Sequence, residues 1–315
     1  MNLKKAFMSL VVVVAVGAMA FATGAKETVT NKSEQKLKFG FSIMIGDNPY
    51  FVAVKKGFED RAKELGIEAV ILDAKYDAQT QYGQVENFIA SRMAAICIAP
   101  VDHKSLETVV AKAKKAGIVV VSEAQGISNA DANIIVNDYD YGVANGKNVV
   151  RWINEKLGGE AQVLIISQDN VEAVVQRANG MVDTIKKFSP KAIIVARQTG
   201  DTPEAAMRIT EGALTANPGI NVIACVNDSS ALGAYEAVKA RVKDTSKFYV
   251  GGADKTAEAV AKMKEPGSFF RATIDIDPYG TGKKCVDVML DYVKTGVKNE
   301  TIYFEMVPVW QEDLK

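Results

Sequence analysis

The sequence has few of the residues that build metal centres and covalent chemistry. It contains three cysteines and a single histidine, His103, which has no cysteine or second histidine near it. Zinc sites and Ser-His-Asp triads both need such partners, so neither is indicated. Cys97, Cys225 and Cys285 lie inside apolar runs, and an odd number does not suit a disulfide framework. We therefore expect buried free thiols, no catalytic residue and no metal ligand.

Neither sign of charge is in excess. Lys and Arg number 38, as do Asp and Glu, so the formal net charge is zero, which argues against a nucleic-acid partner. No expected strand is followed by G-x-G-x-x-G or G-x-x-x-x-G-K-[ST], so a nucleotide-dependent enzyme is not indicated. The turn-like segment NDYDYG at 137–142 lacks the downstream glutamate of a calcium loop. We expect no cofactor.

The longest apolar run stands at the N-terminus. Lys4 and Lys5 precede an apolar stretch over 6–22, and small residues follow it. This order is typical of a secretory signal peptide, expected here over residues 1–25, with an uncleaved membrane anchor as the alternative. It predicts a periplasmic or other extracytoplasmic location. Residues 26–36 are polar and are expected to form a short tether.

From residue 37 onward, short apolar runs alternate with longer amphipathic ones. The first expected strands are FGFSIMI (39–45), AVILDA (69–74), AAICIAP (94–100) and IVVVSEA (118–124), with helices over 49–66, 78–92 and 103–117 between them. A similar series covers 143–276, followed by a helix over 278–296 and an extended segment over 300–310. Near-continuous apolar strands joined by helices are typical of parallel sheets. The chain of 315 residues is long for one core, so we predict an α/β fold with two doubly wound parallel-sheet lobes.

Polar side chains follow most of the expected strands. Open α/β sheets bind ligands beyond the carboxyl ends of their strands, so these side chains are site candidates. Those selected in this way are Asp47, Asn48, Glu123, Gln125, Asp169, Asn227, Asp254 and Asp275. Their amides and carboxylates can bond several hydroxyl groups at once, unlike the Gly-rich loop that phosphate needs. The pattern therefore predicts a site for a small polar ligand.

Four motifs in order resemble one family. They are IGDNPYFVAVKKGFEDRAKELG, NDSSALGAYEAVKA, YVGGADKTAEAVAKMKE and FRATIDIDPYGTGKK. Together they are similar to the ribose/galactose-type periplasmic binding proteins of ABC transporters, which share their lobes with LacI-type repressors. The resemblance implies a non-enzymatic, type I periplasmic binding protein with a three-segment hinge. It also implies an N-terminal lobe from 37–137 plus 277–304 and a C-terminal lobe from 138–276 plus 305–315.

The resemblance assigns roles to individual residues. It implies that Asn48, Asn227 and Asp254 hydrogen-bond a sugar, that Tyr50 and Phe51 lie beside its ring, and that Arg177 forks onto its hydroxyls. Three alternatives stay open: Phe51 as a core residue, Arg177 as a solvated helix residue, and Asp254 as a helix N-cap. Asp228 is expected to cap the helix that follows Asn227.

The pocket departs from that of ribose-binding relatives. Ala99 stands at an asparagine position, Glu123 or Gln125 must replace an Asp-Arg pair, Asp201 or a neighbour stands at an aromatic position, and Ile276 stands at a glutamine position. Ribose is therefore not the expected ligand. The additional carboxylates suit a polyol or an amino sugar, because a carboxylate pairs with hydroxyl donors or with an ammonium group.

These features predict an extracytoplasmic solute-binding protein. It is expected to capture a monosaccharide or a derivative such as a polyol or amino sugar by hinge closure, and to deliver it as a monomer to an ABC transporter permease. The alternative is a receptor that presents a sugar-like signal, such as an autoinducer, to a chemoreceptor or sensor kinase. A LacI-type regulator would need a basic helix-turn-helix before the first strand, where a signal-like segment stands instead.

Overall fold

The structure is a computed structural model that describes residues 36–314. The predicted signal peptide at 1–25 and all of the tether except Lys36 lie outside the described residues. Both sheets of the fold belong to one compact unit, Lys36–Lys315. Within the described part of the chain, no helix combines the length and the apolar character needed to cross a bilayer.

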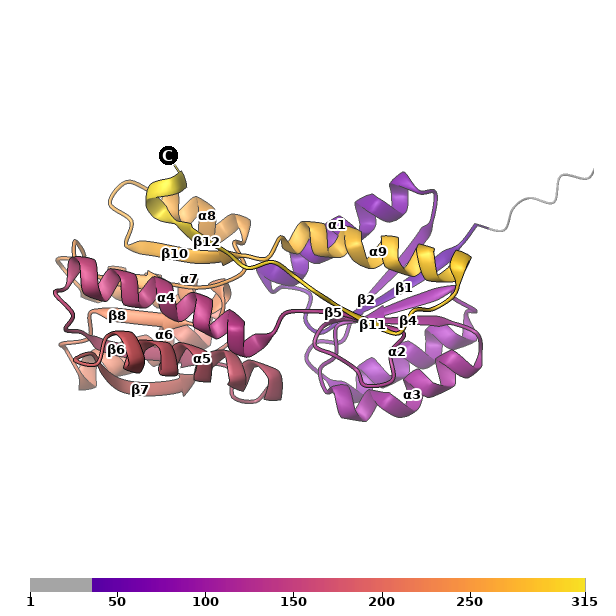
Figure 1. Ribbon diagram of the computed structural model, residues 1–315, viewed down its shortest axis with the longest axis horizontal. Coiled ribbons are helices and arrows are strands. Elements are labelled where there is room, and N and C mark those ends of the chain that lie inside the picture. The colour runs from indigo at the N-terminus through magenta and orange to yellow at the C-terminus, as the bar shows by residue number, and fades with distance from the viewer. Residues whose placement is uncertain (1–35, 315) are drawn as a thin grey trace, which may run out of the picture. The chain divides into compact units, whose positions relative to one another are not determined.

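The first sheet has six parallel strands in the order β11-β5-β4-β3-β1-β2. They are β1 (Lys38–Ile43), β2 (Glu68–Asp73), β3 (Ala95–Ile98), β4 (Val119–Ala124), β5 (Ala132–Ile135) and β11 (Glu300–Tyr303). The helices of this first lobe are α1 (Pro49–Glu64), α2 (Ala78–Ala90), α3 (His103–Lys115) and α9 (Pro278–Thr295). In Figure 1, α1 and α9 lie above this sheet, and α2 and α3 lie below it.

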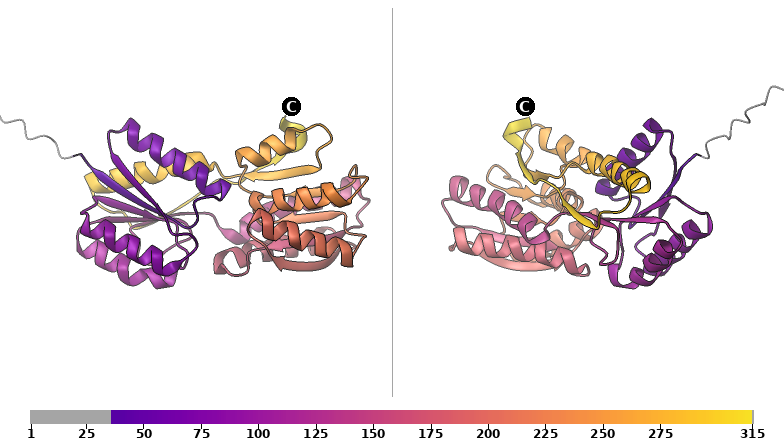
Figure 2. Two further views of the ribbon diagram at one scale, coloured as in Figure 1. Left: turned by 180° about the vertical axis from the view of Figure 1, so that it is seen from behind. Right: turned by 45° about the vertical axis from the view of Figure 1, so that its right-hand side comes forward.

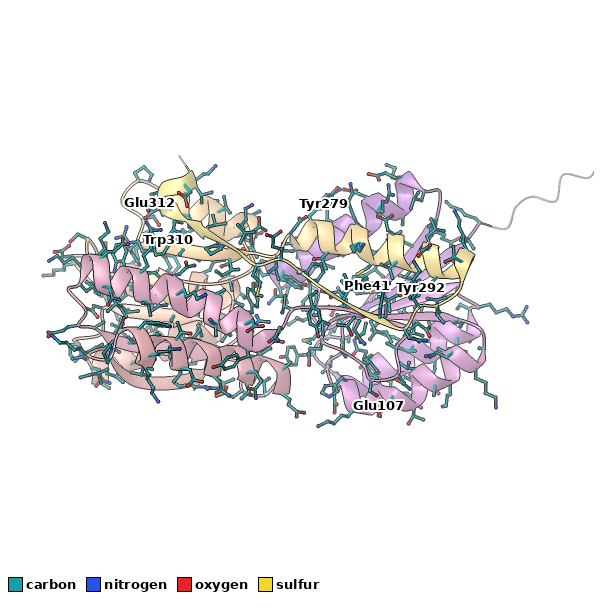
Figure 3. The ribbon with its side chains drawn as sticks, viewed as in Figure 1. Phe41, Glu107, Tyr279, Tyr292, Trp310 and Glu312 are labelled. Carbon is teal, nitrogen blue, oxygen red and sulfur yellow. The ribbon has the colours of Figure 1, made fainter. Side chains whose placement is uncertain are left out.

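Alternating side chains of the strands divide the first lobe into two cores. Ala95 and Cys97 of β3 pack with α1 and α9, whereas Ile96 and Ile98 pack with α2 and α3. Successive side chains of a strand point to opposite faces of the sheet. Because both faces of the sheet are buried, every residue of β3 is apolar. Phe41, from β1, belongs to the first of these cores (Figure 3).

The second sheet also has six strands, in the order β12-β10-β9-β8-β6-β7. They are β6 (Gln162–Ser167), β7 (Ile193–Thr199), β8 (Val222–Cys225), β9 (Tyr249–Gly251), β10 (Phe270–Asp275) and β12 (Val307–Trp310). The helical elements of this second lobe are α4 (Asp138–Lys156), α5 (Glu172–Phe188), α6 (Pro203–Ala216), α7 (Asp228–Arg241), α8 (Ala257–Lys264) and the 3₁₀ helix η1 (Gln311–Leu314). Side chains of α4 and α5 share one core, and those of α6, α7 and α8 share the other. Figure 2 shows helices packed on both sides of the strands in this lobe.

The predicted α/β fold with two mainly parallel sheets is confirmed, with three differences in detail. The short strand β5 was not predicted, because a run of four residues carries little periodicity. The segment 137–142 was expected to be a turn, but it forms the first turn of α4, capped by Asn137. The segment 300–310 is not one extended piece: β11 joins the first sheet, whereas β12 pairs antiparallel with β10 in the second.

The chain passes between the two sheets three times. The passages lie between β5 and α4, between β10 and α9, and between β11 and β12. Figure 1 shows the three connecting segments next to one another between the lobes. The carboxyl ends of β1, β4, β6 and β8 consequently lead to the same region between the two sheets.

Two pairs of helices approach each other so closely that only glycine fits at the contact. A Cβ atom at Gly142 of α4 would lie 1.8 Å from the carbonyl oxygen of Arg177 in α5, and one at Gly180 would lie 2.3 Å from the carbonyl oxygen of Tyr139. In the first lobe, Gly57 of α1 and Gly282 of α9 meet backbone oxygens at 1.9 Å in the same way. The contact at Gly142 fixes the position of α5, and with it the position of Arg177.

Gly142→Ala is expected to lower the free energy of unfolding by about 1–3 kcal/mol, because the added methyl group overlaps the α5 backbone. Urea unfolding followed by circular dichroism measures this change. The matched control is Gly212→Ala on α6, where a Cβ atom would meet nothing within 4 Å. Alanine should there be neutral or stabilise by up to about 1 kcal/mol. Equal effects of the two substitutions would contradict the close contact between α4 and α5.

Candidate functional site

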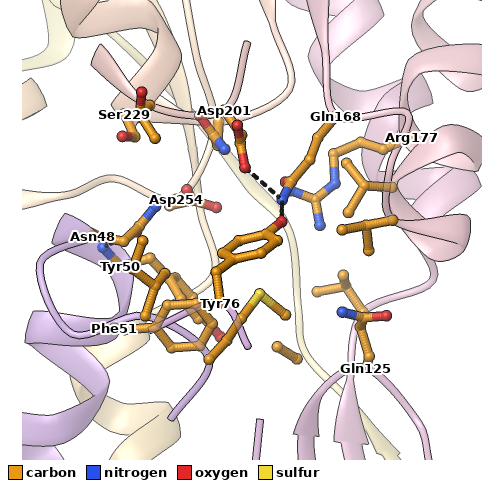
Figure 4. Close-up of a pocket in the computed structure, with 18 of the residues that line it drawn as sticks. Asn48, Tyr50, Phe51, Tyr76, Gln125, Gln168, Arg177, Asp201, Ser229 and Asp254 are labelled. Carbon is orange, nitrogen blue, oxygen red and sulfur yellow. Dashed lines mark hydrogen bonds between the residues drawn. The ribbon is translucent and has the colours of Figure 1, made fainter. Parts of the chain in front are cut away.

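A cavity of about 370 Å³ lies where the carboxyl ends of the strands of both sheets meet. Its size is in the range of small-molecule sites. The first lobe contributes Met44, Ile45, Asp47, Asn48, Tyr50, Phe51, Tyr76, Ala124, Gln125 and Ile135. The second lobe contributes Asp138, Gln168, Val171, Val174, Arg177, Asp201, Thr202, Pro203, Glu204, Asn227, Ser229 and Asp254, and the connecting segments contribute Val136, Ile276 and Phe304. Figure 4 shows most of these side chains.

The start of α1 places two aromatic rings at the cavity. Asn48 is the N-cap, and its side chain accepts a hydrogen bond of 2.9 Å from the backbone N–H of Tyr50. Pro49 occupies the first turn, where its missing N–H costs nothing. The rings of Tyr50 and Phe51 are edge to face, with centroids 5.1 Å apart. Phe51 lines the cavity and also belongs to the core of the first lobe, so the alternative of a core residue is confirmed, and its place beside a sugar ring stays a prediction.

Glu123 lies behind Tyr50 and does not line the cavity, contrary to its selection as a ligand-contacting residue. The hydroxyl of Tyr50 donates to Glu123 Oε1 at 2.5 Å, while Oε2 of this fully buried carboxyl has no hydrogen-bond partner among residues 36–314. Burial raises the pKa of Glu123 to about 7, which the hydrogen bond from Tyr50 opposes. Glu123 therefore holds the ring of Tyr50 in place from behind.

The guanidinium of Arg177 is buried and is held by contacts with three residues. It pairs with Asp138 at 2.7 Å, donates from Nη1 to the carbonyl of Val226 at 3.1 Å, and lies 4.4 Å from the ring centroid of Tyr141. Only 12% of the Arg177 side chain is exposed, so the alternative of a solvated helix arginine is wrong. Fixed contacts on several sides hold the planar group at the wall of the cavity.

Asp254 follows β9 in the left-handed region of the backbone, with φ at 115°, and is 5% exposed. Its Oδ1 accepts a hydrogen bond of 2.9 Å from the hydroxyl of Tyr141. Burial raises the pKa of Asp254 to about 6, although Arg177 and Tyr141 favour the charged form. The alternative role as a helix cap is wrong, because Thr256 caps α8.

Asn227, and not its neighbour Asp228 as expected, is the N-cap of α7. Asn227 caps α7 by accepting at 2.8 Å from the backbone N–H of Ser230, which uses Oδ1 and leaves the amide NH₂ to face a ligand. Asp228 is not the cap. It is the first residue of α7, is fully buried, and accepts from Thr273 and Thr256 behind the cavity.

The remaining candidates divide into two groups. Asp47 and Gln125 line the cavity, and Gln125 Nε2 donates to the carbonyl of Pro100 at 3.1 Å. Asp169 and Asp275 are absent from the lining and engaged elsewhere: Asp169 pairs with Arg197, and Asp275 pairs with Lys255 at 2.6 Å. Their position after a strand made both residues site candidates. That position does not show whether a neighbouring cation forms an ion pair with the carboxylate.

Tyr76 is a cavity residue that the sequence did not single out. It follows Lys75 in the loop after β2, and both have left-handed φ values, 53° and 62°. Gln168 Nε2 donates to the hydroxyl of Tyr76 and also, at 3.2 Å, to Asp201 (Figure 4). The ring packs against the cores of both lobes. The rule on strand ends could have found Tyr76 if it had been applied to aromatic as well as polar residues.

The three cysteines are buried and free, as expected. His103 is the first residue of α3 and lies outside the cavity. Among residues 36–314, no cluster of three or more His, Cys, Asp or Glu side chains is arranged to hold a metal ion.

The family model described as "Periplasmic binding protein domain" matches residues 39–298. The chain belongs to this family. A curated relative, the D-allose-binding periplasmic protein of Escherichia coli (strain K12), is 31% identical to this binding protein over 258 residues, which cover 79% of the chain and 82% of the relative. The ribose import binding protein of Bacillus subtilis (strain 168) is 28% identical over 272 residues, which cover 86% of each chain.

A solved structure extends the likeness to the whole fold. An ABC transporter periplasmic solute binding protein from Actinobacillus succinogenes, solved with bound D-allose, has a TM-score of 0.80 to this binding protein at 26% identity. The match covers 89% of this chain and 99% of the other. The predicted resemblance to ribose/galactose-type periplasmic binding proteins is thereby confirmed, and the relatives are named as binding proteins.

Tyr76→Phe is expected to weaken the association of the two lobes, because it removes the hydroxyl that bonds Gln168 across the cavity. A lost hydrogen bond of about 0.5–1.5 kcal/mol changes the ratio of open to closed molecules roughly 2- to 12-fold. Small-angle X-ray scattering without ligand should show a larger radius of gyration. Tyr82→Phe is the matched control, because in the described part of the chain its hydroxyl forms a hydrogen bond only with Lys112, which lies in the same lobe. Identical scattering of both variants and the wild type would contradict a role for Tyr76 between the lobes.

Glu123→Gln is expected to reduce the pH dependence of stability. The folded-state pKa of Glu123, about 7, exceeds the unfolded value of about 4.3. The protein therefore loses stability as pH rises through this window, by about 4 kcal/mol for this group. Glutamine still accepts from Tyr50 but cannot ionise. Urea unfolding at about pH 5 and about pH 8 should give a smaller difference for the variant than for the wild type. Glu59→Gln, at an exposed position of α1, should behave as wild type; a similar flattening there would contradict this assignment.

Proposed function

We propose that this protein captures a monosaccharide or a related polyol outside the cytoplasm and delivers it to an ABC transporter. The observation that carries the proposal is the cavity between the lobes, where an aromatic pair stands on the first lobe and an arginine, an amide and a carboxylate stand on the second. The family membership of the chain and the ribose and D-allose named for its relatives support it.

The lining suits a hydroxylated ring. The faces of Tyr50 and Phe51 can cover C–H surface, whereas a ligand's hydroxyl groups can donate to Asp254 and accept from Arg177 and the Asn227 amide. We propose as ligand contacts Asp47, Asn48, Tyr50, Phe51, Gln125, Arg177, Asn227 and Asp254. Glu123 acts through Tyr50, and Asp169 and Asp275 take no direct part.

Closure couples binding to delivery. A ligand that contacts both walls of the cavity stabilises the arrangement in which the lobes are together, because those contacts form only there. The three connecting segments are the proposed hinge, with an N-terminal lobe from 37–137 plus 277–304 and a C-terminal lobe from 138–276 plus 305–315. The permease then distinguishes loaded from empty protein by the spacing of the lobes. Both walls of the cavity come from the same chain, so binding and closure need no second copy of the protein. We therefore propose a monomer.

Asn227→Ser tests the site without removing a helix cap. Serine still accepts from the backbone of α7 but lacks the amide donor, so stability should change little while affinity falls about 10- to 100-fold.

Isothermal titration calorimetry should first identify a ligand among ribose, allose, galactose, myo-inositol and their amino derivatives. A ligand at about a hundred times its dissociation constant should also stabilise the protein by about 2.7 kcal/mol.

The matched control is Asp102→Ser, which changes the N-cap of α3 outside the cavity. This variant should bind like the wild type. Binding of an amino acid or nucleoside, with no response to any sugar or polyol, would overturn the proposed function. Equal losses of affinity in the two variants would overturn the proposed site.

A further inference from the structure

The cavity has many more acidic than basic side chains. Its lining includes five carboxylates, from Asp47, Asp138, Asp201, Glu204 and Asp254. The single cation among the described lining residues is the guanidinium of Arg177. If all of these groups are ionised, the walls carry a clear excess of negative charge that a ligand in the cavity must meet.

Arg177 does not balance this excess, because Asp138 already takes up its charge. Asp138 Oδ1 accepts from Nη2 of Arg177 at 2.7 Å and from Nε at 2.9 Å. Both side chains are about nine-tenths buried. A buried pair with this geometry is close to neutral as a unit, so the four other carboxylates leave the lining with an excess of negative charge.

Asp254 is the most deeply buried of these carboxylates. It accepts from the hydroxyl of Tyr141, and in the part of the chain that the structure describes no ion pair joins it to Lys or Arg. Its burial raises its pKa to about 6, although Arg177 and the hydrogen bond from Tyr141 favour the charged form. A hydroxyl group of a neutral sugar can bond Asp254 but adds no positive charge to the acidic lining.

Asp201 stands on the same wall. It accepts from Gln168 Nε2 at 3.2 Å, and within residues 36–314 it likewise forms no ion pair. Figure 4 shows Asp201 and Asp254 on the second-lobe side of the cavity. On the opposite wall, Asp47 of the first lobe adds a third carboxylate. A cation placed in the cavity would therefore face acidic groups from both lobes.

We infer that the ligand is a hydroxylated amine, an amino sugar or amino polyol, whose ammonium group is received by the unpaired carboxylates of Asp201 and Asp254. This inference rests on the proposed function and narrows its ligand class. The hydroxyl groups of such a ligand meet Asn48, Asn227 and the guanidinium of Arg177, and its C–H face meets Tyr50. The ammonium group supplies the positive charge that the cavity walls lack.

Matched ligand pairs test the inference by calorimetry. The pairs are D-glucose with D-glucosamine, D-galactose with D-galactosamine, and myo-inositol with scyllo-inosamine. The N-acetyl derivatives of the two hexosamines keep the nitrogen substituent without its charge. In the best-binding pair, the amine should bind at least about 10-fold more tightly than its neutral partner, which corresponds to about 1.4 kcal/mol. Acetylation should abolish this advantage.

Charge-removing variants identify the receiving groups. Asp254→Asn and Asp201→Asn keep the size of each side chain and remove its charge. Each should lower the affinity for the amine about 10-fold or more while changing that for the neutral partner much less. The matched control is Glu211→Gln on α6, which pairs with Arg241 outside the cavity and should bind both ligands as the wild type does. If Asp254→Asn fails to fold, Asp201→Asn, at a less buried position, still decides the question.

The outcomes separate this inference from the proposed function. Neutral sugars or polyols that bind as tightly as their amines, or more tightly, would overturn the inference and leave the proposed function intact. An amine preference that persists in both aspartate variants would overturn the assignment of the ammonium group to Asp201 and Asp254. Failure of every sugar, polyol and amine to bind would overturn the proposed function and the inference together.

Discussion

The buried ion pair between Arg177 and Asp138 is the interaction on which the polar wall of the cavity depends. It joins α5 to the first turn of α4, directly after the chain has passed from the first sheet to the second. The guanidinium also stacks on Tyr141, whose hydroxyl holds Asp254. Four side chains from two helices and one strand end thus form a connected group, and displacing one changes the surroundings of the others. The glycine contact at Gly142 allows this group to form, since α4 and α5 could not otherwise approach so closely.

The first lobe builds its wall by a different means. A helix that starts at the cavity, with Asn48 as cap, presents Tyr50 and Phe51 side by side. Glu123 then fixes the hydroxyl of Tyr50 from the core side. The two walls therefore differ in chemistry: the first carries the aromatic rings, and the second carries most of the charged side chains. A ligand must satisfy both, which limits it to molecules with an apolar face and several polar groups.

Tyr76 connects these walls. Its left-handed backbone is an uncommon conformation for a residue other than glycine, asparagine or aspartate, and such conformations persist where surrounding contacts support them. Here the ring packs against both cores, and the hydroxyl bonds Gln168 on the second lobe. Tyr76 thus follows a strand of the first lobe in the sequence, and its side chain lines the cavity between the two lobes. This arrangement gives the loop after β2 a role in the spacing of the lobes.

The sequence by itself determined the alternation of strands and helices, the two sheets and the strand ends at which polar residues gather, because periodicity and capping are local properties. It also identified Asn48, Tyr50, Arg177 and Asp254 through motifs that resemble a known family. Only the tertiary structure decided which carboxylates lie free in the cavity and which are neutralised. Asp169 also follows a strand, yet it pairs with Arg197, which lies 28 positions further along the chain. An ion pair of this kind depends on contacts between segments that are distant in the sequence. A local pattern of neighbouring residues does not predict such contacts.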